Sequence, residues 1–501
     1  MTVFQPGIKA TLAVCTAVGF SFSVSAAPWI DPGDLRMRHS LQQLSDHRVM
    51  QTPQTTWPVM WIDAQGFSPS QVPGHNESVA QSFAYIRFEA NQQARLGFRA
   101  KVELNGASDP LLFRGFASLP REKGEIGKHI EWTGEWATIG ISPSYAFDAQ
   151  DDKEYRLDGS YAAITLGNWV FGAGAIERWW GPGWHTSLIL SSNARPVPGF
   201  WFNRKQALAP ESRWLSWIGP WTFTAFGGQL ESSRHIPEAK LLGARFAFMP
   251  ISRLEIGLSR TAQWGGEGRP ESLSNLFDLM LGTEDNVYTE EGRKDEPGNQ
   301  LGGIDFRYGF PLGQASLGIY AQTVGEDEAG GFPSKRFNLL GLDMATQLAS
   351  SEQRLYLEYA DTVVGSLFEG RLYNVAYEHG LYRTGYRYRG RNLAATWDSD
   401  ARVLTLGAIN FFSSGSDLAL ALSRAELNQD GRSRAAVPDE HAKHYLIPST
   451  SQDLWILDLA YRFVFLNGRT TLWGQWMNDK LQTVGGEMSE FAVGASWQYR
   501  F

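Results

Sequence analysis

The sequence of 501 residues contains a single cysteine, Cys15. Cys15 lies in an N-terminal stretch typical of a secretory signal peptide: Lys9 is basic, Ala10 to Val24 are apolar or small, and Val24-Ser25-Ala26 forms a small-residue cleavage site. We therefore expect residues 1–26 to be removed on export. The remaining chain has no cysteine, which excludes disulfides, a thiol nucleophile and a cysteine metal site.

The sequence also lacks long apolar runs, an excess of basic residues and a visible repeat. Beyond residue 26 no run of about 18 apolar residues occurs, so we expect no transmembrane helix. The formal net charge of -8 at pH 7 argues against nucleic acid as the main partner. A repeat of about 40 residues, as in a β-propeller, is absent. Export without a helical anchor leaves the periplasm, the outer membrane or the medium.

Aromatic residues and glycine, by contrast, are abundant. Aromatics make up 13% of the chain, with 19 Trp, and there are 52 Gly. The mean hydropathy is nevertheless only -0.28. Aromatic belts, glycine-rich turns and modest hydropathy together favour a transmembrane antiparallel β-barrel, and a large secreted all-β protein is the alternative.

The last residues, Ser489 to Phe501, alternate between two kinds of side chain. Every second residue from Phe491 to Phe501 is apolar or aromatic, and the residues between them are polar or small. Because side chains on a strand alternate faces, one face of this strand is apolar. The closing strand of an outer-membrane barrel explains the pattern, with the apolar face toward lipid and the terminal aromatics in the interfacial girdle.

Residues 27–80 differ from the rest of the chain. Asp34 is placed to cap a helix that ends near His47. Apolar residues recur in it near helical spacing, at Leu35, Met37, Leu41 and Leu44. We expect a short helical and irregular periplasmic segment outside the barrel wall, which acts as a plug or lid.

Residues 81–501 are expected to form the barrel wall. Alternation starts at Phe83, Tyr85, Arg87 and Glu89, and the patterns give roughly sixteen to twenty strands. Tight turns are expected at Gly167-Asn168, Met249-Pro250, Phe310-Pro311, Ser414-Gly415 and Asn467-Gly468. Long loops are expected at 142–158, 181–219, 263–300, 324–335 and 427–452. The loop at 263–300 includes a stretch, 272–281, that can form a short amphipathic helix.

Two stretches carry candidate binding chemistry. If Tyr382 to Arg391 is a strand, Arg383, Arg387, Arg389 and Arg391 share one face, and charge on the lipid face costs roughly 2–4 kcal/mol, so they should face the lumen. They can bind carboxylate, phosphate or sulfate groups, or pair with lumen carboxylates such as Glu358, Glu378 and Asp361.

The second stretch runs from Glu177 to Pro196. Its tryptophans, interleaved with glycine and proline, can stack on sugar rings while arginine, asparagine and histidine donate hydrogen bonds; a packed turn beside an aromatic girdle is equally compatible. Across both stretches, the candidate ligand-binding residues are Arg178, Trp179, Trp180, Trp184, His185, Asn193, Arg195, Arg383, Arg387 and Arg389.

The motif from Arg178 to Pro196, with Asn203-Arg204 and Arg213-Trp214-Leu215 beyond it, resembles the Wzi family of capsule assembly proteins. The opening of that family is similar to Asp31-Pro32-Gly33-Asp34, Leu44-Ser45-Asp46 and Thr55-Thr56-Trp57-Pro58. The resemblance implies an outer-membrane barrel of about 18 strands with a helical periplasmic portion and a closed lumen. It also implies a lectin-like role, in which loops hold capsular or related polysaccharide at the cell surface.

Three functions can be weighed. The main hypothesis is a surface polysaccharide-binding barrel, probed by glycan binding; the alternative is a channel or porin-type transporter, probed by conductance. An outer-membrane hydrolase is disfavoured because no Gly-x-Ser-x-Gly motif is present, so we expect no enzyme activity. We expect outer-membrane lipid as a further partner, a monomer, and no cofactor.

Two weaker patterns concern metals. His441 and His444 have helical spacing but no third ligand in view, so a solvated loop is favoured over a metal site. The acidic clusters Glu326-Asp327-Glu328 and Glu290-Glu291 could bind calcium, but ordinary solvated loops are favoured. No metal is therefore expected.

Overall fold

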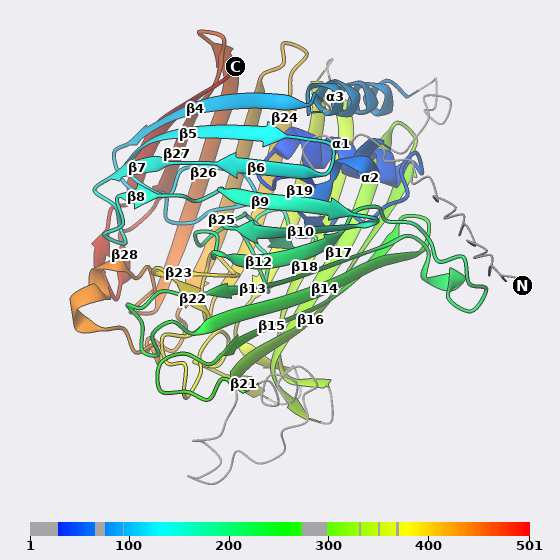
Figure 1. The fold of residues 1–501 in the computed structure, drawn as a ribbon. Coiled ribbons are helices and arrows are strands. Elements are labelled where there is room, and N and C mark those ends of the chain that lie inside the picture. The colour runs from blue at the N-terminus through cyan, green and yellow to red at the C-terminus, as the bar shows by residue number, and fades with distance from the viewer. Residues whose placement is uncertain are drawn as a thin grey trace, which may run out of the picture.

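The chain folds into a closed antiparallel barrel (Figure 1). The computed structural model describes residues 29–65, 76–93, 95–272, 298–329, 332–348, 351–366 and 370–501. β30 (Phe491–Arg500) closes the barrel against β4 (Gly97–Ala107), with Trp497 opposite Leu104. The predicted signal peptide lies outside the described residues.

The wall has 18 strands within the described residues, which confirms the predicted barrel of about 18 strands. β6 and β7 both pair with β5 and make one interrupted strand; β8 and β9, which pair with β7 and β6, make the next. The remaining wall strands follow in chain order, each paired with the next. Their bounds are β5 (Gly124–Thr133), β6 (Ala137–Ile141), β7 (Ser144–Phe147), β8 (Tyr155–Arg156), β9 (Tyr161–Leu166), β10 (Trp169–Gly174), β12 (Gly199–Arg204), β13 (Trp221–Gln229), β14 (Lys240–Ile251), β15 (Leu254–Trp264), β16 (Gly298–Leu312), β17 (Ala315–Ala329), β18 (Phe332–Leu348), β19 (Ser351–Asp361), β24 (Arg402–Phe411), β25 (Asp417–Leu427), β26 (Gln452–Phe465) and β27 (Gly468–Met477).

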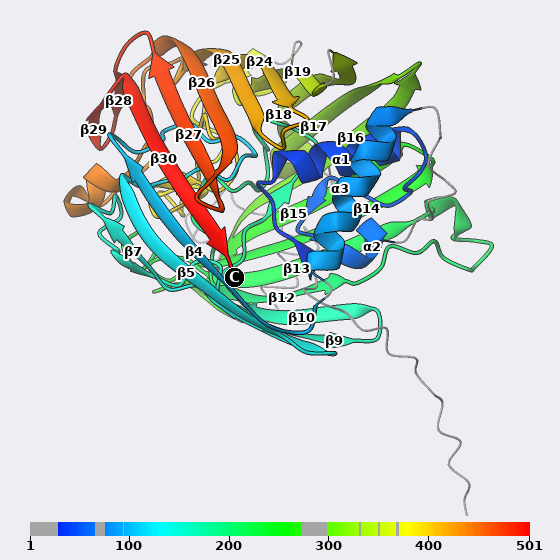
Figure 2. The ribbon, with the colours of Figure 1, turned by 90° about the horizontal axis from the view of Figure 1, so that it is seen from above.

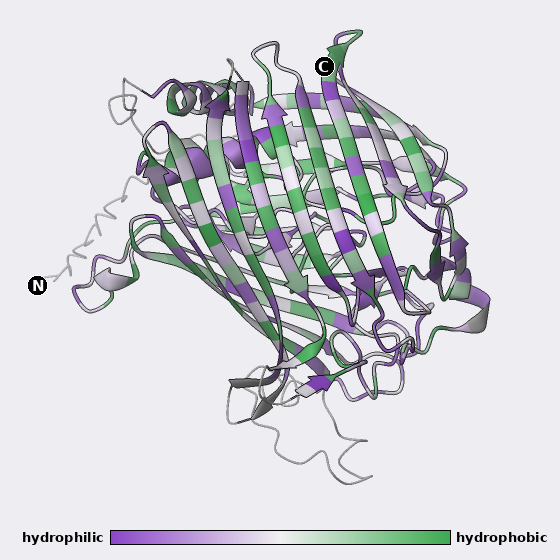
Figure 3. Ribbon diagram, turned by 180° about the vertical axis from the view of Figure 1, so that it is seen from behind, coloured by the Kyte–Doolittle hydropathy of each residue, from purple (hydrophilic) through white to green (hydrophobic). Residues whose placement is uncertain are grey.

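Side chains alternate across the wall as the final strand predicted. On β30, Phe491 and Val493 are 49% and 42% exposed, whereas Ala492 between them is 5% exposed. Figure 3 shows the resulting bands of hydrophobic and hydrophilic residues along the strands. The outward rows are apolar and suit lipid, and the inward rows carry polar and charged groups that pair inside the barrel.

The two ends of the barrel differ in their connections. At one end, the turn end, most hairpins are tight, and the C-terminus lies there beside the helices (Figure 2). The turns predicted at Gly167-Asn168 and Ser414-Gly415 are confirmed, and the one at Asn467-Gly468 is displaced by one residue. The two turns predicted at Met249-Pro250 and Phe310-Pro311 are wrong: these residues lie within β14 and β16, and the turns are Ser252-Arg253 and Gly313-Gln314, three residues later.

The opposite end, the loop end, carries the long connections. The loop predicted at 427–452 is confirmed and contains the 3-10 helix η3 (Asp439–His444). The loop predicted at 263–300 agrees with the strand bounds, since β15 ends at Trp264 and β16 begins at Gly298. The other three predicted bounds need correction, because 142–158 includes β7 and β8, 181–219 includes β12, and β17 and β18 extend through most of 324–335. The proposed helix at 272–281, apart from its first residue, and the Glu290-Glu291 cluster lie outside the described residues.

The helix predicted near the N-terminus is confirmed as α1 (Leu35–Asp46). Asp34 caps it, because its carboxylate accepts a 3.0 Å hydrogen bond from the backbone N–H of Met37. α1 is not a peripheral lid: all but one of its residues are buried, and it contacts β16 and β17 inside the mouth of the barrel. α2 (Trp61–Gln65) follows it.

The predicted start of the wall at residue 81 is wrong, since α3 (Glu77–Gln93) crosses that position. Val79, Phe83, Ile86 and Ala90 are buried at helical spacing, and this period outweighs the short two-residue alternation seen in the sequence. The wall begins only at Gly97. Among the described residues, no helix is both long and apolar enough to cross a membrane.

Candidate functional site

The lumen is filled by four segments from different parts of the chain. They are the N-terminal segment 29–65, the β4–β5 loop, the β10–β12 loop and the β19–β24 loop. Most of their buried apolar residues, with those of the inner wall, form one large core cluster that extends from Trp29 to Phe411 in the sequence, and two smaller clusters include Leu111, Leu112 and Phe113 of the β4–β5 loop. Thus the barrel has a packed interior, as a soluble domain has.

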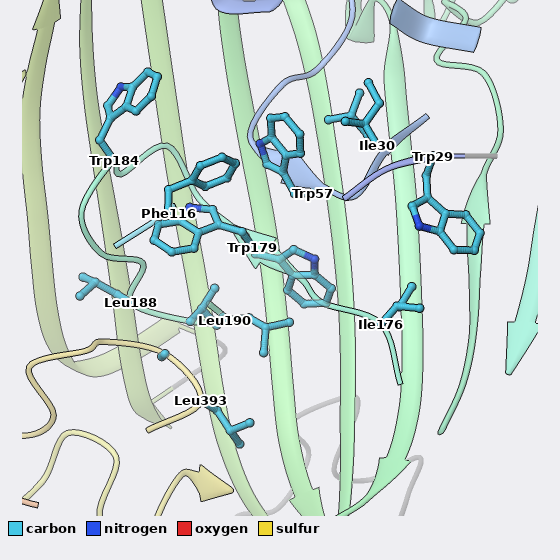
Figure 4. Close-up of a cluster of buried hydrophobic side chains, with 14 of the residues drawn as sticks. Trp29, Ile30, Trp57, Phe116, Ile176, Trp179, Trp184, Leu188, Leu190 and Leu393 are labelled. Carbon is cyan, nitrogen blue, oxygen red and sulfur yellow. The ribbon is translucent and has the colours of Figure 1, made fainter. Parts of the chain in front are cut away.

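The tryptophan motif lies in the centre of this core. Trp179 and Trp180 form β11 (Trp179–Trp180), which pairs with β2 (Thr56–Trp57). The two sequence motifs that suggested the family therefore contact each other directly. Figure 4 shows Trp57, Trp179 and Trp184 gathered around Phe116, and the rings of Trp57 and Phe116 are 5.1 Å apart.

The prediction that these tryptophans stack on sugars does not fit their burial. Trp179 and Trp180 are 0% exposed and Trp184 is 2% exposed, so no ring face is open to a ligand. The guanidinium of Arg38 on α1 already lies over the rings of Trp184 and Phe116, at 4.2 and 4.3 Å. The motif thus holds the N-terminal plug, and its burial favours a packed turn over a sugar platform.

Wall residues fix the backbone of the motif. The Glu358 carboxylate accepts hydrogen bonds from the backbone N–H groups of Trp184 at 2.7 Å, His185 at 3.2 Å and Thr186 at 2.9 Å. Gly183 is required in this turn, because a Cβ there would lie 2.1 Å from the Thr186 carbonyl oxygen. The spacing of glycine and tryptophan is therefore set by close packing.

The other candidates from this motif are also internal. His185 stacks on Trp397 at 5.2 Å, and burial lowers the pKa of His185 to about 4. Asn193 is buried and donates to the Asn392 carbonyl at 2.9 Å. Arg178 is buried over the ring of Phe226 at 4.4 Å.

Arg195 lies closer to the loop end but is paired. It donates to Asp151 at 2.5 Å and to Asp158 at 2.6 Å. Its guanidinium is therefore engaged by two carboxylates and serves to hold the rim of the barrel together.

The predicted arginine strand is a folded loop inside the barrel. Only β22 (Arg387–Tyr388) and β23 (Arg391–Asn392) are extended, as a two-stranded hairpin. Gly385 and Gly390 adopt φ values of 75° and 83°, which break the alternation that a wall strand requires. The four arginines consequently point in different directions and have different partners.

Three of these arginines are structural. Arg387 is fully buried and pairs with Glu378 at 2.6 Å and Asp398 at 2.5 Å. Burial lowers its pKa, but the two carboxylates outweigh that effect and raise it above the ordinary value. Arg391 donates to the Leu111 carbonyl at 2.8 Å, and Arg389 lies 3.5 Å from Asp151. Of the expected partners, Glu378 is confirmed, whereas Glu358 binds the backbone of the tryptophan motif and Asp361 pairs with Arg402.

Arg383 differs from the rest of the series because its side chain is exposed. Three loops meet around it: the backbone N–H of Ala436 donates to the Arg383 carbonyl at 2.7 Å, and that of His235 donates to Thr384 Oγ1 at 2.9 Å. The exposed side chains of Arg432 and Arg434 extend from the same stretch as Ala436.

We refer to Arg383, Arg432 and Arg434, together with the neutral side chain of His235, as the cationic cluster. Within the part of the chain that the structure describes, no carboxylate lies in salt-bridge range of its three arginines. Burial and the charge of Arg383 lower the pKa of His235, so that ring is neutral near pH 7 and can both donate and accept. Sequence inspection missed Arg432 and Arg434, although Gly431-Arg432-Ser433-Arg434 in a long loop is a visible signal.

The metal candidates have ordinary partners. His444 lies 2.8 Å from Asp152, and Glu326 is buried and accepts from the backbone N–H of Tyr377. In the described ranges, no group of three His, Cys, Asp or Glu residues is arranged to hold a metal ion.

The described interior is closely packed. Two cavities in it, one lined by Arg391 and Asp398 and the other by Met60 and Asn203, have volumes of about 10 Å³ each. Such a volume holds about one water molecule. The barrel is therefore a closed wall with an apolar outer face around a packed core. Its exposed polar side chains at the loop end are the ones available to a ligand.

This architecture is that of an outer-membrane β-barrel with a plugged lumen. A family model described as capsule assembly protein Wzi matches residues 95–480, so the chain belongs to that family. The chain is 31% identical over 359 residues, 71% of its length, to a Klebsiella pneumoniae protein described as an uncharacterized 55.8 kDa protein in the cps region, of which it covers 69%.

A solved structure is similar over almost the whole chain. It is that of Wzi, described as an outer-membrane protein involved in group 1 capsule assembly in Escherichia coli and as a carbohydrate-binding β-barrel. The TM-score is 0.78 at 26% identity, over 94% of this chain and 99% of that one. The present chain is accordingly an outer-membrane protein of this family.

Proposed function

We propose that the protein binds an acidic polysaccharide of the cell surface, capsular or related, through the cationic cluster at the loop end. The observation that carries this proposal is the exposed set Arg383, Arg432 and Arg434, which has no carboxylate in salt-bridge range among the described residues. Arg434 donates to the Asn374 carbonyl at 3.0 Å, whereas the buried Arg387 pairs with two carboxylates. The carbohydrate-binding relative and the relative from a cps region support the ligand class.

The chemistry of the cluster suits repeating carboxylate groups. Guanidinium groups bind carboxylates with two parallel hydrogen bonds, and clustered cations bind a polyanion cooperatively because each bound unit raises the local concentration of the next. His235 adds a neutral donor and acceptor that can bind sugar hydroxyls. The cluster combines side chains from three loops, so a chain of several sugars can contact all of it at once.

The closed core argues against the channel hypothesis. Its four filling segments pack into the wall, and two cavities among the described residues hold only about 10 Å³ each, too small for a solute path. A binding role needs no such path. We place the turn end in the periplasm and the loop end outside, and we assign the protein no catalytic step and a monomeric state.

Glycan binding by paired variants tests the proposal. Purified protein in detergent would be titrated with an acidic capsular polysaccharide and with a neutral dextran, at low and high salt. We expect Arg383→Glu with Arg432→Glu to weaken binding of the acidic polymer by about tenfold or more. Binding by the wild type should weaken at high salt.

A matched control is available at the other end of the barrel. Arg87 and Arg95 are exposed near the turn end, and Arg87→Glu with Arg95→Glu makes the same charge change there. This control should bind as the wild type does. Unchanged binding by the first pair, or equal loss in the control, contradicts the proposed site.

A further inference from the structure

The β12–β13 connection, residues 205–220, is the long exception among the short hairpins of the turn end. It ends in a 3-10 helix, η2 (Ser216–Ile218). Its large apolar side chains are turned outward: Trp214 is 76% exposed, Trp217 62%, Leu208 50% and Leu215 48%. A soluble surface rarely exposes two tryptophans and two leucines within ten residues.

This connection lies on the outer side of the wall. Arg245 on β14 points into the lumen, where it pairs with Asp305, so Phe246 and Phe248 on the same strand face outward. Trp217 packs edge-on against Phe248, with ring centres 6.2 Å apart. Trp217 is therefore continuous with the lipid-facing surface of the barrel, and Trp214 is exposed three residues before it in the same connection.

Basic groups accompany these aromatics. The guanidinium of Arg204 lies 3.5 Å over the ring of Trp221, whose ring centre is 5.6 Å from that of Phe246 on the outer face. Arg213 lies 5.1 Å over Trp214. Residues 204–220 contain three basic side chains and one acidic side chain, Glu211. Tryptophan beside arginine is the composition preferred at the membrane–water interface, where rings sit among headgroups and cations meet phosphates.

We infer that residues 205–220 form an interface loop that inserts Trp214 and Trp217 into the phospholipid headgroup layer around the turn end of the barrel. The loop extends the apolar surface beside the shortest wall strands. β10 and β12 are only six residues long, whereas β14 to β19 have 11 to 17 residues. A strand needs about nine residues to cross the apolar layer, so this side of the wall requires such a supplement. The inference does not depend on polysaccharide binding.

A single labelled cysteine can test this directly. Cys15 is the sole cysteine and lies in the predicted signal peptide, so Cys15→Ser with Ser216→Cys gives one attachment point in the loop. The environment-sensitive dye NBD would be attached there, and the protein reconstituted into vesicles of phosphatidylethanolamine and phosphatidylglycerol with or without brominated phospholipid. Gln314→Cys, in an exposed tight turn at the same end, and Leu406→Cys, on the outer wall, give the aqueous and lipid references.

We expect the dye at position 216 to emit at shorter wavelength than at 314, and brominated lipid to quench it at least about twofold more strongly. Trp214→Ala with Trp217→Ala should return position 216 toward the spectrum of 314. Trp136→Ala, which removes another exposed tryptophan at the turn end, should not. Equal spectra and equal quenching at 216 and 314 overturn the inference, as does quenching at 216 that is unaffected by loss of both tryptophans.

Discussion

Arg38 is a buried guanidinium held by aromatic faces. It lies between Trp184 and Phe116 and donates to the Pro182 carbonyl at 2.6 Å, and no carboxylate of the described residues is in salt-bridge range. Burial lowers its pKa to about 9, so it remains charged at neutral pH. The residue thus joins α1 to the tryptophan motif through cation–π contacts and one hydrogen bond.

Substitution of Arg38 tests this role. Arg38→Ala leaves a void between two rings and should lower the free energy of unfolding by about 3 kcal/mol. Arg38→Met keeps most of the volume without the charge and should cost clearly less, because a buried charge can be replaced by an apolar group of similar size. Thermal unfolding in detergent measures both. Equal stability of the alanine variant and the wild type would contradict the role of Arg38 in joining α1 to the tryptophan motif.

His185 predicts a pH dependence. Its folded pKa is about 4, whereas an unfolded histidine titrates near 6.5. Between these values the unfolded chain binds a proton that the folded ring does not, so the free energy of unfolding falls as the pH falls through this range. His185→Gln removes that loss. The stability difference between wild type and variant should therefore shrink by roughly 3 kcal/mol from pH 7 to pH 4.

The measurement is thermal unfolding of both proteins in detergent across that pH range. Their difference above pH 7 gives the packing cost of the substitution alone. If the difference stays constant down to pH 4, the ring is not held neutral by burial.

At this scale the sequence left real alternatives open. A tryptophan-rich turn is compatible with a sugar platform, an interfacial girdle or a core. The partner that decides between them, Arg38, lies about 140 residues away on another element. No local pattern reports such a contact, and so the burial of Trp179 and Trp180 could not be derived from their neighbours in the sequence.

Among the elements, α1 attaches the N-terminal segment to the inner wall of the barrel through Asp46. Asp46 at its last position pairs with Arg307 on β16 at 2.6 Å, and Arg307 also pairs with Asp343 on β18 at 3.0 Å. Ser316 on β17 donates to Asp46 at 3.1 Å. A single carboxylate therefore ties the helix to two neighbouring wall strands inside the barrel.

Asp46→Ala should loosen α1 selectively. Removing one partner of a buried ion pair costs about 3–5 kcal/mol, and here the loss is local to the plug because Arg307 keeps Asp343. We expect faster amide hydrogen exchange over residues 35–46, with little change in the wall. Glu77→Ala, which removes an exposed carboxylate from α3, is the control. Unchanged amide hydrogen exchange over α1 would contradict the claim that Asp46 attaches the helix to the wall.

The prediction of helices and strands from the sequence succeeded where the periodicity of apolar residues was long or was supported by a helix cap. α1 has both helical spacing and the Asp34 cap, and β30 has a long alternation. It failed at α3, where a few alternating residues competed with the longer helical period of Val79, Phe83, Ile86 and Ala90. It failed again at Arg383 to Arg391, where two left-handed glycines turn an apparent strand into a loop.

The whole molecule is a closed barrel with a solid interior. The outer-membrane barrel class and its strand number followed from alternation and from family resemblance. The route of the four filling segments did not, because it depends on long-range contacts such as β11 with β2. The surface that these segments leave accessible, including the cationic cluster, could be found only in three dimensions.

The closed interior predicts negligible conductance. In planar bilayers the wild type should pass little ion current, because its lumen contains a packed core instead of a water-filled path. A porin of known conductance serves as the positive control for open barrels. Steady single-channel currents of similar size from the present protein would contradict the prediction.

Amide hydrogen exchange with and without an acidic surface polysaccharide tests the proposed binding mode most directly. We predict slower exchange in residues 230–239, 378–386 and 430–436, the three loops that carry the cationic cluster. Helix α3 at the turn end should not change. Absence of slowing in those three loops while the polysaccharide is bound, or slowing centred on the turn end, would contradict a ligand held by the loop end.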